Sequence, residues 1–164
     1  MNFIKGLVLT ICALVLSLLD TSFFSAMPLF GATIISTFVF AMVLCVSKDQ
    51  NILIYYSVSS VFFFSIFSSL PVWLIVVVFL LIPYILFFIR KKYFPKQSIP
   101  SSIPFFMAGT LIFSFILLVY NKQWDIDGVI VVIYFMIINS ALGMGLYYIL
   151  ARWEQDFGRK EIKF

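Results

Sequence analysis

The chain has 164 residues, of which 63% are hydrophobic and 11% are charged, and its formal net charge is +4. Soluble domains average about 45–50% apolar and about 25% charged residues, so this composition excludes an ordinary water-soluble domain. The sequence contains no histidine and only two cysteines, Cys12 and Cys45, which excludes Ser-His-Asp hydrolysis, histidine-ligated metal centres and a cysteine metal cage. The apolar runs lack the alternating polarity of barrel strands, so we expect a polytopic all-α membrane protein.

The first 46 residues hold two expected spans. From Gly6 to Val46 the only charged residue is Asp20, and one helical crossing needs about 20 mostly apolar residues. We therefore predict helices at about 3–22 and 30–46. Pro28 and Gly31 are typical turn residues and mark the connection between the two helices.

The uncharged run 52–89 holds the next two expected spans. A short serine break before Pro71 divides it into helices at about 52–67 and 71–89. Pro83 is expected to kink the second of these, because proline removes one backbone hydrogen bond inside a helix. The sequence leaves open whether both helices cross fully or form a shallow re-entrant hairpin.

Two more spans follow, at about 104–120 and 128–152, with Pro104 in a first helical turn, where its missing N–H costs little. The whole pattern predicts a bundle of about six transmembrane helices in one domain, 1–152. A short charged tail, 153–164, follows this domain.

The basic residues predict the orientation, because lysine and arginine concentrate in the cytoplasmic loops of membrane proteins. With both termini in the cytoplasm, Lys122 is the only one of the 11 basic residues in an outer loop. The loop after the fourth expected span is the most basic. It is expected to fix the topology and to attract anionic lipid through four residues, Arg90, Lys91, Lys92 and Lys96.

Asp20 is the acidic residue closest to the membrane interior. The 14 residues from Gly6 to Leu19 span about 21 Å of helix, which favours a helix-end carboxylate in contact with water. The alternative is a buried contact or a pocket role, since an unpaired charge in a bilayer is costly. The polar residues that could face the outer side together are Asp20, Thr21, Trp124, Asp125 and Asp127.

Small residues cluster in the last expected span. They allow close approach of helices, either within the bundle, which is the commoner use, or against a partner protein. The cluster consists of Asn139, Ser140, Ala141, Gly143 and Gly145. The sequence has no phosphate-binding loop, G-x-S-x-G or H-E-x-x-H motif, so we expect neither an enzyme nor a cofactor.

Two stretches of the sequence are similar to those of a known family: LLDTSFFSAMPLFGA (Leu18–Ala32) and SIFSSLPVWLIVVVFLLIPYILFFIRKKYF (Ser65–Phe94). Through these stretches the sequence resembles the MreD family of bacterial rod-shape-determining membrane proteins. The chain departs from the family where Gly31 is followed by ATII rather than Pro-Asp, and where the glycine-rich third helix of the family is replaced by Tyr, Ser, Val and Phe.

The resemblance implies a non-enzymatic scaffold of the cell-elongation machinery in the bacterial inner membrane. Its implied partners are MreC-like proteins and, through them, an MreB-like filament and the peptidoglycan synthases. The expected contact surfaces are the small residues of the last span, the basic loop and the tail, and no nucleic acid is expected as a partner. The alternative is a substrate-binding membrane subunit of an energy-coupling-factor vitamin transporter, whose ligand would bind at the outer-face polar residues.

Overall fold

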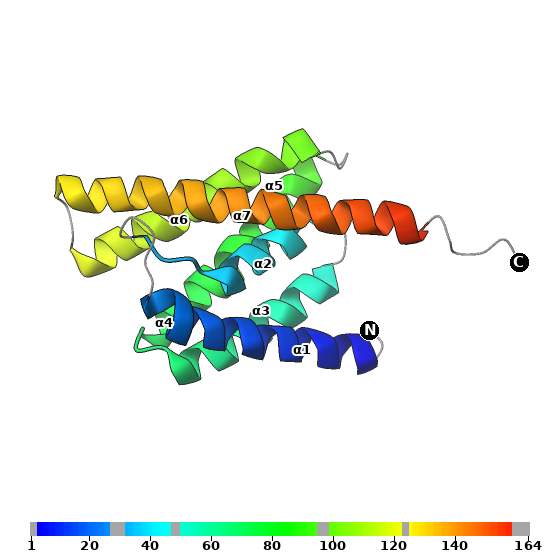
Figure 1. Cartoon of the computed structure of the whole chain (residues 1–164), viewed down its shortest axis with the longest axis horizontal. Coiled ribbons are helices and arrows are strands. Elements are labelled where there is room, and N and C mark those ends of the chain that lie inside the picture. The colour runs from blue at the N-terminus through cyan, green and yellow to red at the C-terminus, as the bar shows by residue number, and fades with distance from the viewer. Residues whose placement is uncertain (1–2, 27–31, 47–49, 95–98, 123–124, 159–164) are drawn as a thin grey trace, which may run out of the picture.

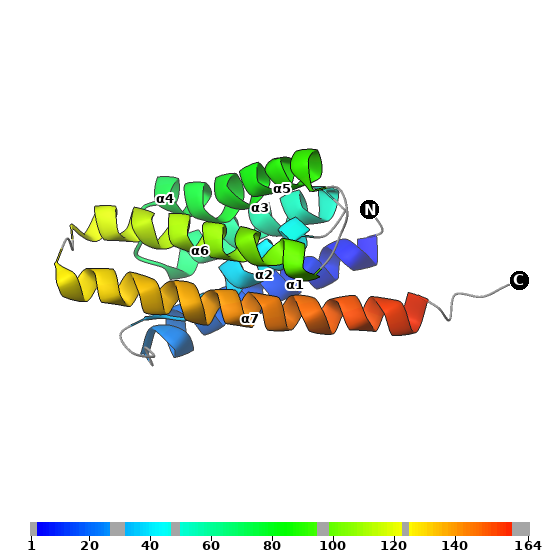
Figure 2. The ribbon, with the colours of Figure 1, turned by 90° about the horizontal axis from the view of Figure 1, so that it is seen from above.

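Five apolar helices, each long enough to cross a membrane, make up most of the molecule (Figures 1 and 2). The structure is a computed structural model that describes residues 3–26, 32–46, 50–94, 99–122 and 125–158. Helix α1 (Phe3–Leu18) runs directly into the π-helical turn η1 (Leu19–Phe24), and α3 (Gln50–Phe67) is the second crossing helix. The third is one continuous helix made of α4 (Val72–Val76), η2 (Val77–Leu81) and α5 (Ile82–Tyr93). The last two are α6 (Ile99–Asn121) and α7 (Ile126–Gly158). The all-helical fold expected from the sequence is therefore confirmed for the described residues.

The sixth apolar helix is much shorter than the others. Helix α2 (Ser36–Val46) has 11 residues, or about 16 Å, which is about half the thickness of a bilayer core. Residues 32–35 before it are not helical, so the helix expected at about 30–46 was too long at its start. Residues 27–31, with the predicted turn residues Pro28 and Gly31, lie outside the described residues.

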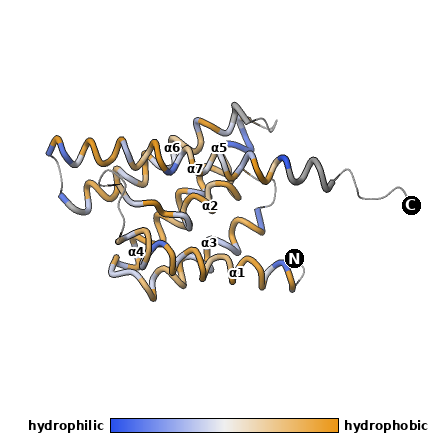
Figure 3. The backbone as a smooth tube through the Cα atoms, viewed as in Figure 1, coloured by the Kyte–Doolittle hydropathy of each residue, from blue (hydrophilic) through white to orange (hydrophobic). Residues whose placement is uncertain are grey.

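Helix α2 lies at the centre of the bundle and contacts α3, α5 and α7. Eight of its 11 residues are buried, whereas α1 has only its inner face covered. The rings of Phe38 and Phe113 lie 4.9 Å apart, and Phe113 stacks on Phe135 at 5.1 Å. These aromatic contacts join α2, α6 and α7 into one core. Figure 3 shows that the long helices are apolar along much of their length. Many of their large apolar side chains are exposed, which suits contact with lipid.

The fourth expected span is continuous but irregular. It consists of α4 (Val72–Val76), the π-helical turn η2 (Val77–Leu81) and α5 (Ile82–Tyr93). The π-helical turn ends two residues before Pro83, where the sequence predicts a kink. A widened turn can accommodate the missing N–H and the bulky ring of proline. Both α3 and α4–η2–α5 are long enough to cross the membrane, so the interrupted span is α2 rather than either of these two.

Three other helix ends differ from the expected positions. Helix α6 begins at Ile99, so Pro104 lies inside the helix rather than in its first turn. Helix α5 continues to Tyr93, beyond the expected end at Ile89. Helix α7 runs on to Gly158, so its backbone includes the first half of the expected tail. In all three cases the helix continues through polar residues, because the backbone bonds do not require apolar side chains once a helix has begun.

Candidate functional site

The amino end of α2 is held by a carboxylate from the first helix. Asp20 lies in η1 and is 6% exposed. Its Oδ1 accepts hydrogen bonds from the backbone N–H of Ser36 at 2.8 Å and from the Ser36 hydroxyl at 2.6 Å, and its Oδ2 accepts from the N–H of Thr37 at 2.8 Å. The first amides of a helix have no partner within the helix, so Asp20 acts as a cap supplied by another helix. The expectation that Asp20 contacts water is therefore wrong, and the alternative of a buried contact is correct.

A second polar side chain holds the non-helical segment that leads into α2. Asn139 of α7 is 1% exposed. Its Oδ1 accepts from the N–H of Ile35 at 3.0 Å, and its Nδ2 donates to the carbonyl oxygens of Thr33 at 3.1 Å and Phe135 at 3.0 Å. Irregular backbone at membrane depth is tolerated only where protein groups satisfy it, and Asn139 satisfies two such groups.

Arg90 lies at the opposite end of α2. Its side chain is 7% exposed, and its Nη1 donates to the carbonyl oxygen of Cys45 at 3.5 Å. The sequence placed Arg90 in an exposed basic loop; the structure instead buries it in the last turn of α5, because this helix extends past Ile89. Lys91 and Lys92 are exposed, and Lys96 lies outside the described residues.

Asp20 and Arg90 therefore place opposite charges at the two ends of α2. A helix carries about half a positive charge at its amino end and about half a negative charge at its carboxyl end. An anion at the first end and a cation at the second both reduce this dipole energy, and the effect is strongest in surroundings of low dielectric constant. The arrangement stabilises a short helix whose ends both lie inside the protein.

The small residues of α7 divide between two faces. Ser140 is buried, and its hydroxyl hydrogen-bonds to that of Thr110 at 2.9 Å. Gly143 is buried against Phe106, so that a Cβ at this glycine would come within 2.6 Å of the ring. Ala141 and Gly145 are exposed, and nothing lies within 4 Å of a Cβ built on Gly145. The bundle thus uses Asn139, Ser140 and Gly143 and leaves the other two on the surface.

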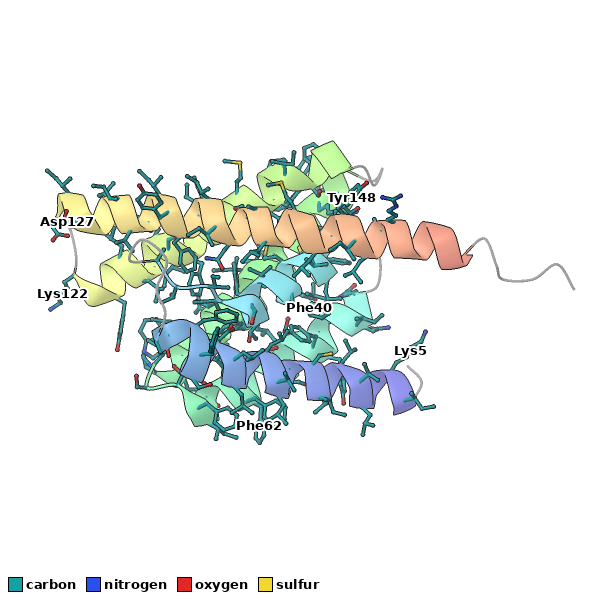
Figure 4. All side chains as sticks on the ribbon, viewed as in Figure 1. Lys5, Phe40, Phe62, Lys122, Asp127 and Tyr148 are labelled. Carbon is teal, nitrogen blue, oxygen red and sulfur yellow. The ribbon has the colours of Figure 1, made fainter. Side chains whose placement is uncertain are left out.

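The expected outer-face polar residues do not form one group. Asp20 is occupied with α2, and the Thr21 hydroxyl donates to the carbonyl of Ser17 at 2.8 Å. Asp125 accepts from the N–H of Gly128 at 3.0 Å and so caps its own helix α7. Asp127 is exposed at one end of the bundle (Figure 4), and Trp124 lies outside the described residues.

Two pockets open on the side of the bundle, and both are mainly apolar. The larger one has a volume of about 660 Å³ and lies between α1 and α3, where the hydroxyls of Thr10 and Tyr55 are 3.0 Å apart. The smaller one, of about 170 Å³, lies between α3, η2 and α5 next to Ser57 and Tyr84. Within the described residues, no group of three or more histidine, cysteine or acidic side chains could hold a metal ion.

Sequence reasoning found the capping residues but missed their targets. Asp20, Asn139 and Arg90 were all candidates, whereas the backbone that they bind was expected to be ordinary helix. Tyr56 was also missed: it is fully buried, and its hydroxyl donates to the carbonyl of Thr37 at 3.2 Å. The signal that could have revealed the interruption was the group of hydroxyl residues near the start of α2, since serine and threonine favour helix starts.

Comparison of the chain with protein-family models, with characterised proteins and with solved structures finds no match.

Proposed function

We propose that this protein is a non-enzymatic integral membrane scaffold that acts through contacts with other membrane proteins. One observation carries the proposal: four buried side chains, those of Asp20, Asn139, Arg90 and Tyr56, bind the backbone of the interrupted span or of the segment that leads into it. Asp20 binds Ser36 and Thr37, Asn139 binds residues 33 and 35, and Arg90 binds Cys45. Side chains engaged in this way support a rigid fold, which is what a scaffold requires.

The orientation that we propose places both termini in the cytoplasm, with six crossing segments if the interrupted span is counted. The distribution of charge supports it. Lys5, Lys91, Lys92 and Arg152 are exposed, and the first of these lies at the opposite end of the bundle from Lys122 and Asp127 (Figure 4). An excess of basic residues at one end is typical of the cytoplasmic side.

The contact surface that we propose is the exposed face of α7. It consists of Ile137, Ala141, Gly145 and Tyr148, which follow each other at helical spacing and are all exposed. Small residues between larger apolar ones allow a second helix to approach closely. Because the sequence resembles the MreD family, the partner that we propose is the membrane helix of an MreC-like protein in a bacterial inner membrane, and through it the cell-elongation machinery.

A photo-crosslinking amino acid at Ala141 tests this proposal. In the native membrane we expect an adduct with an MreC-like protein, identified by mass spectrometry. The matched control is the same amino acid at Ile11, which is 50% exposed on another helix, α1, and should give no such adduct. Equal labelling of unrelated proteins from both positions would contradict the scaffold.

The transporter-subunit alternative has one observation in its favour. Transporters often bind substrates at the inner ends of interrupted helices, and α2 is such a helix. In this chain, however, the amides of Ile35, Ser36 and Thr37 are already bound by side chains of the protein itself. A vitamin present in stoichiometric amount after purification in mild detergent would favour the transporter subunit over the scaffold.

A further inference from the structure

Three hydroxyl groups are fully buried between α1, α2 and α3 and make no hydrogen bond. They belong to Ser17, Thr37 and Ser60, and each side chain is 0% exposed. Buried polar groups in proteins nearly always have a partner, so unpartnered groups that lie together point to a ligand. A fourth such hydroxyl, that of Ser57, lines the small pocket on another side of α3.

The three hydroxyl residues lie at one level of the bundle. The level is set by a contact of three buried residues, one from each helix: Ala13, Ala41 and Tyr56. Ser17 comes four residues after Ala13, and Ser60 comes four residues after Tyr56. Thr37 comes four residues before Ala41. Helices α1 and α3 run in the same direction and α2 runs in the opposite one (Figure 1). The three hydroxyls are therefore one helical turn from the contact, all toward the same end.

Two further oxygen atoms lie in this region. Asp20 is three residues beyond Ser17 on the same helix, and its Oδ2 accepts one hydrogen bond, from the N–H of Thr37. The Thr37 side chain interacts with this carboxylate and the Ser60 side chain interacts with the phenol of Tyr56, but neither hydroxyl meets the geometry of a hydrogen bond. The Tyr56 hydroxyl gives its proton to the carbonyl of Thr37, which leaves its oxygen able to act as a ligand.

The charge of Asp20 is only partly compensated within the described residues. The groups that interact with its carboxylate there are Ser36, Thr37 and Tyr56, with no lysine or arginine among them. The dipole of α2 supplies about half a positive charge at this point. A carboxylate in a bilayer interior needs a counter-charge or marks a path for ions, and carboxylate and hydroxyl oxygens are the ligands that hard cations prefer.

We propose that these five oxygen atoms, from Ser17, Asp20, Thr37, Tyr56 and Ser60, form a binding site for a dehydrated monovalent cation of the size of Na⁺. One carboxylate matches a single positive charge, whereas a divalent ion would need more acidic ligands. The ion would hold the three helices together at the start of α2. This site is independent of the scaffold function proposed above, and either can fail without the other.

The test is the thermal stability of the purified protein in detergent, with equal concentrations of NaCl, LiCl, KCl or choline chloride. A ligand that binds only the folded state raises its unfolding temperature, so we expect a temperature several degrees higher in NaCl than in choline chloride. Ser60→Ala should abolish this difference, because it removes a ligand that makes no hydrogen bond within the protein. Ser65→Ala is the matched control on the same helix, since that hydroxyl donates to the carbonyl of Phe62 at 2.8 Å, and it should keep the difference.

Asp20→Asn also weakens the cap of α2, so the variant that decides is Ser60→Ala. Direct binding of radioactive sodium to the unmodified protein supports this test. Equal unfolding temperatures in the four salts, with no bound sodium, would overturn the proposal. A Ser60→Ala variant that is less stable by the same amount in every salt would also overturn it, because the hydroxyls would then hold water rather than a cation.

Discussion

Asp20 and Arg90 bind the two opposite ends of one short helix, although they are 70 positions apart in the sequence. Asp20 accepts hydrogen bonds from the first amides of α2, and Arg90 donates to the carbonyl of Cys45 near its end. Each charge has the sign that the helix dipole favours at its end. The interrupted second span is therefore held in place by side chains of the first and fourth apolar segments.

Replacing Asp20 by alanine should destabilise the protein strongly. Two backbone amides would lose their partner in a buried setting, and each such loss costs about 1–3 kcal/mol. Asp20→Asn should cost less, because its one carbonyl oxygen can keep part of the cap. Unfolding in detergent followed by intrinsic fluorescence measures both changes. Asp127→Ala is the control, since Asp127 is exposed, and a loss of stability as large as that of Asp20→Ala would contradict the capping role.

Asn139→Leu should release the segment before α2. The substitution leaves the N–H of Ile35 and the carbonyl of Thr33 without their partner, at a cost of about 1–3 kcal/mol for each group. A cysteine placed at position 33, in a background without Cys12 and Cys45, should then react faster with a thiol reagent. If the reaction rate is the same with Asn139 and with Leu, the side chain does not hold this segment.

Arg90→Met should lower stability, whereas Lys91→Met should not. Arg90 is buried and binds Cys45, and a hydrogen bond from a charged donor contributes about 1.5–3 kcal/mol. Lys91 is the neighbouring residue of the same charge and is exposed. Chemical unfolding of the two variants side by side is the measurement. Equal stability of both would mean that Arg90 serves only as one more basic residue at this end of the bundle.

The two glycines of α7 should respond in opposite ways to alanine. A Cβ at Gly143 would lie 2.6 Å from the ring of Phe106, which is 1% exposed, so Gly143→Ala should cost about 1–3 kcal/mol. Nothing lies within 4 Å of a Cβ at Gly145, so Gly145→Ala should be neutral or gain up to about 1 kcal/mol from better helix propensity. Thermal unfolding distinguishes the two. A stability loss at Gly145 in the purified chain would show a contact within the fold.

A topology experiment tests the six-segment arrangement. Single cysteines at Ser69, at Lys122 and at Lys91, all in exposed positions, are introduced into a background without native cysteines. An impermeant thiol reagent added outside intact cells should label the first two and leave the third unlabelled. Labelling of the Ser69 position only after the membrane is broken would contradict the proposed orientation of α3 and of the continuous helix α4–η2–α5.

The sequence was sufficient for the features that depend on composition. Long uncharged runs have to be helices in a bilayer, because each backbone group needs a partner within its own segment, and the structure has such helices at five of the six expected places. The sequence also identified Asp20, Asn139 and Arg90 as unusual, since polar side chains are rare in such a chain. It misplaced the starts and ends of α2, α5, α6 and α7, because hydropathy does not mark where a helix begins or ends.

Only the tertiary structure decided what these polar residues do. The conformation of residues 32–35 depends on partners that lie 16 to 106 positions away in the chain. The Asp20 carboxylate binds the first amides of α2, and the Asn139 side chain binds Ile35 and Thr33. Without those partners the non-helical backbone would be too costly in the membrane interior, so its conformation follows from packing and not from local preference. The same holds for α7, where packing alone separates the buried Gly143 from the exposed Gly145.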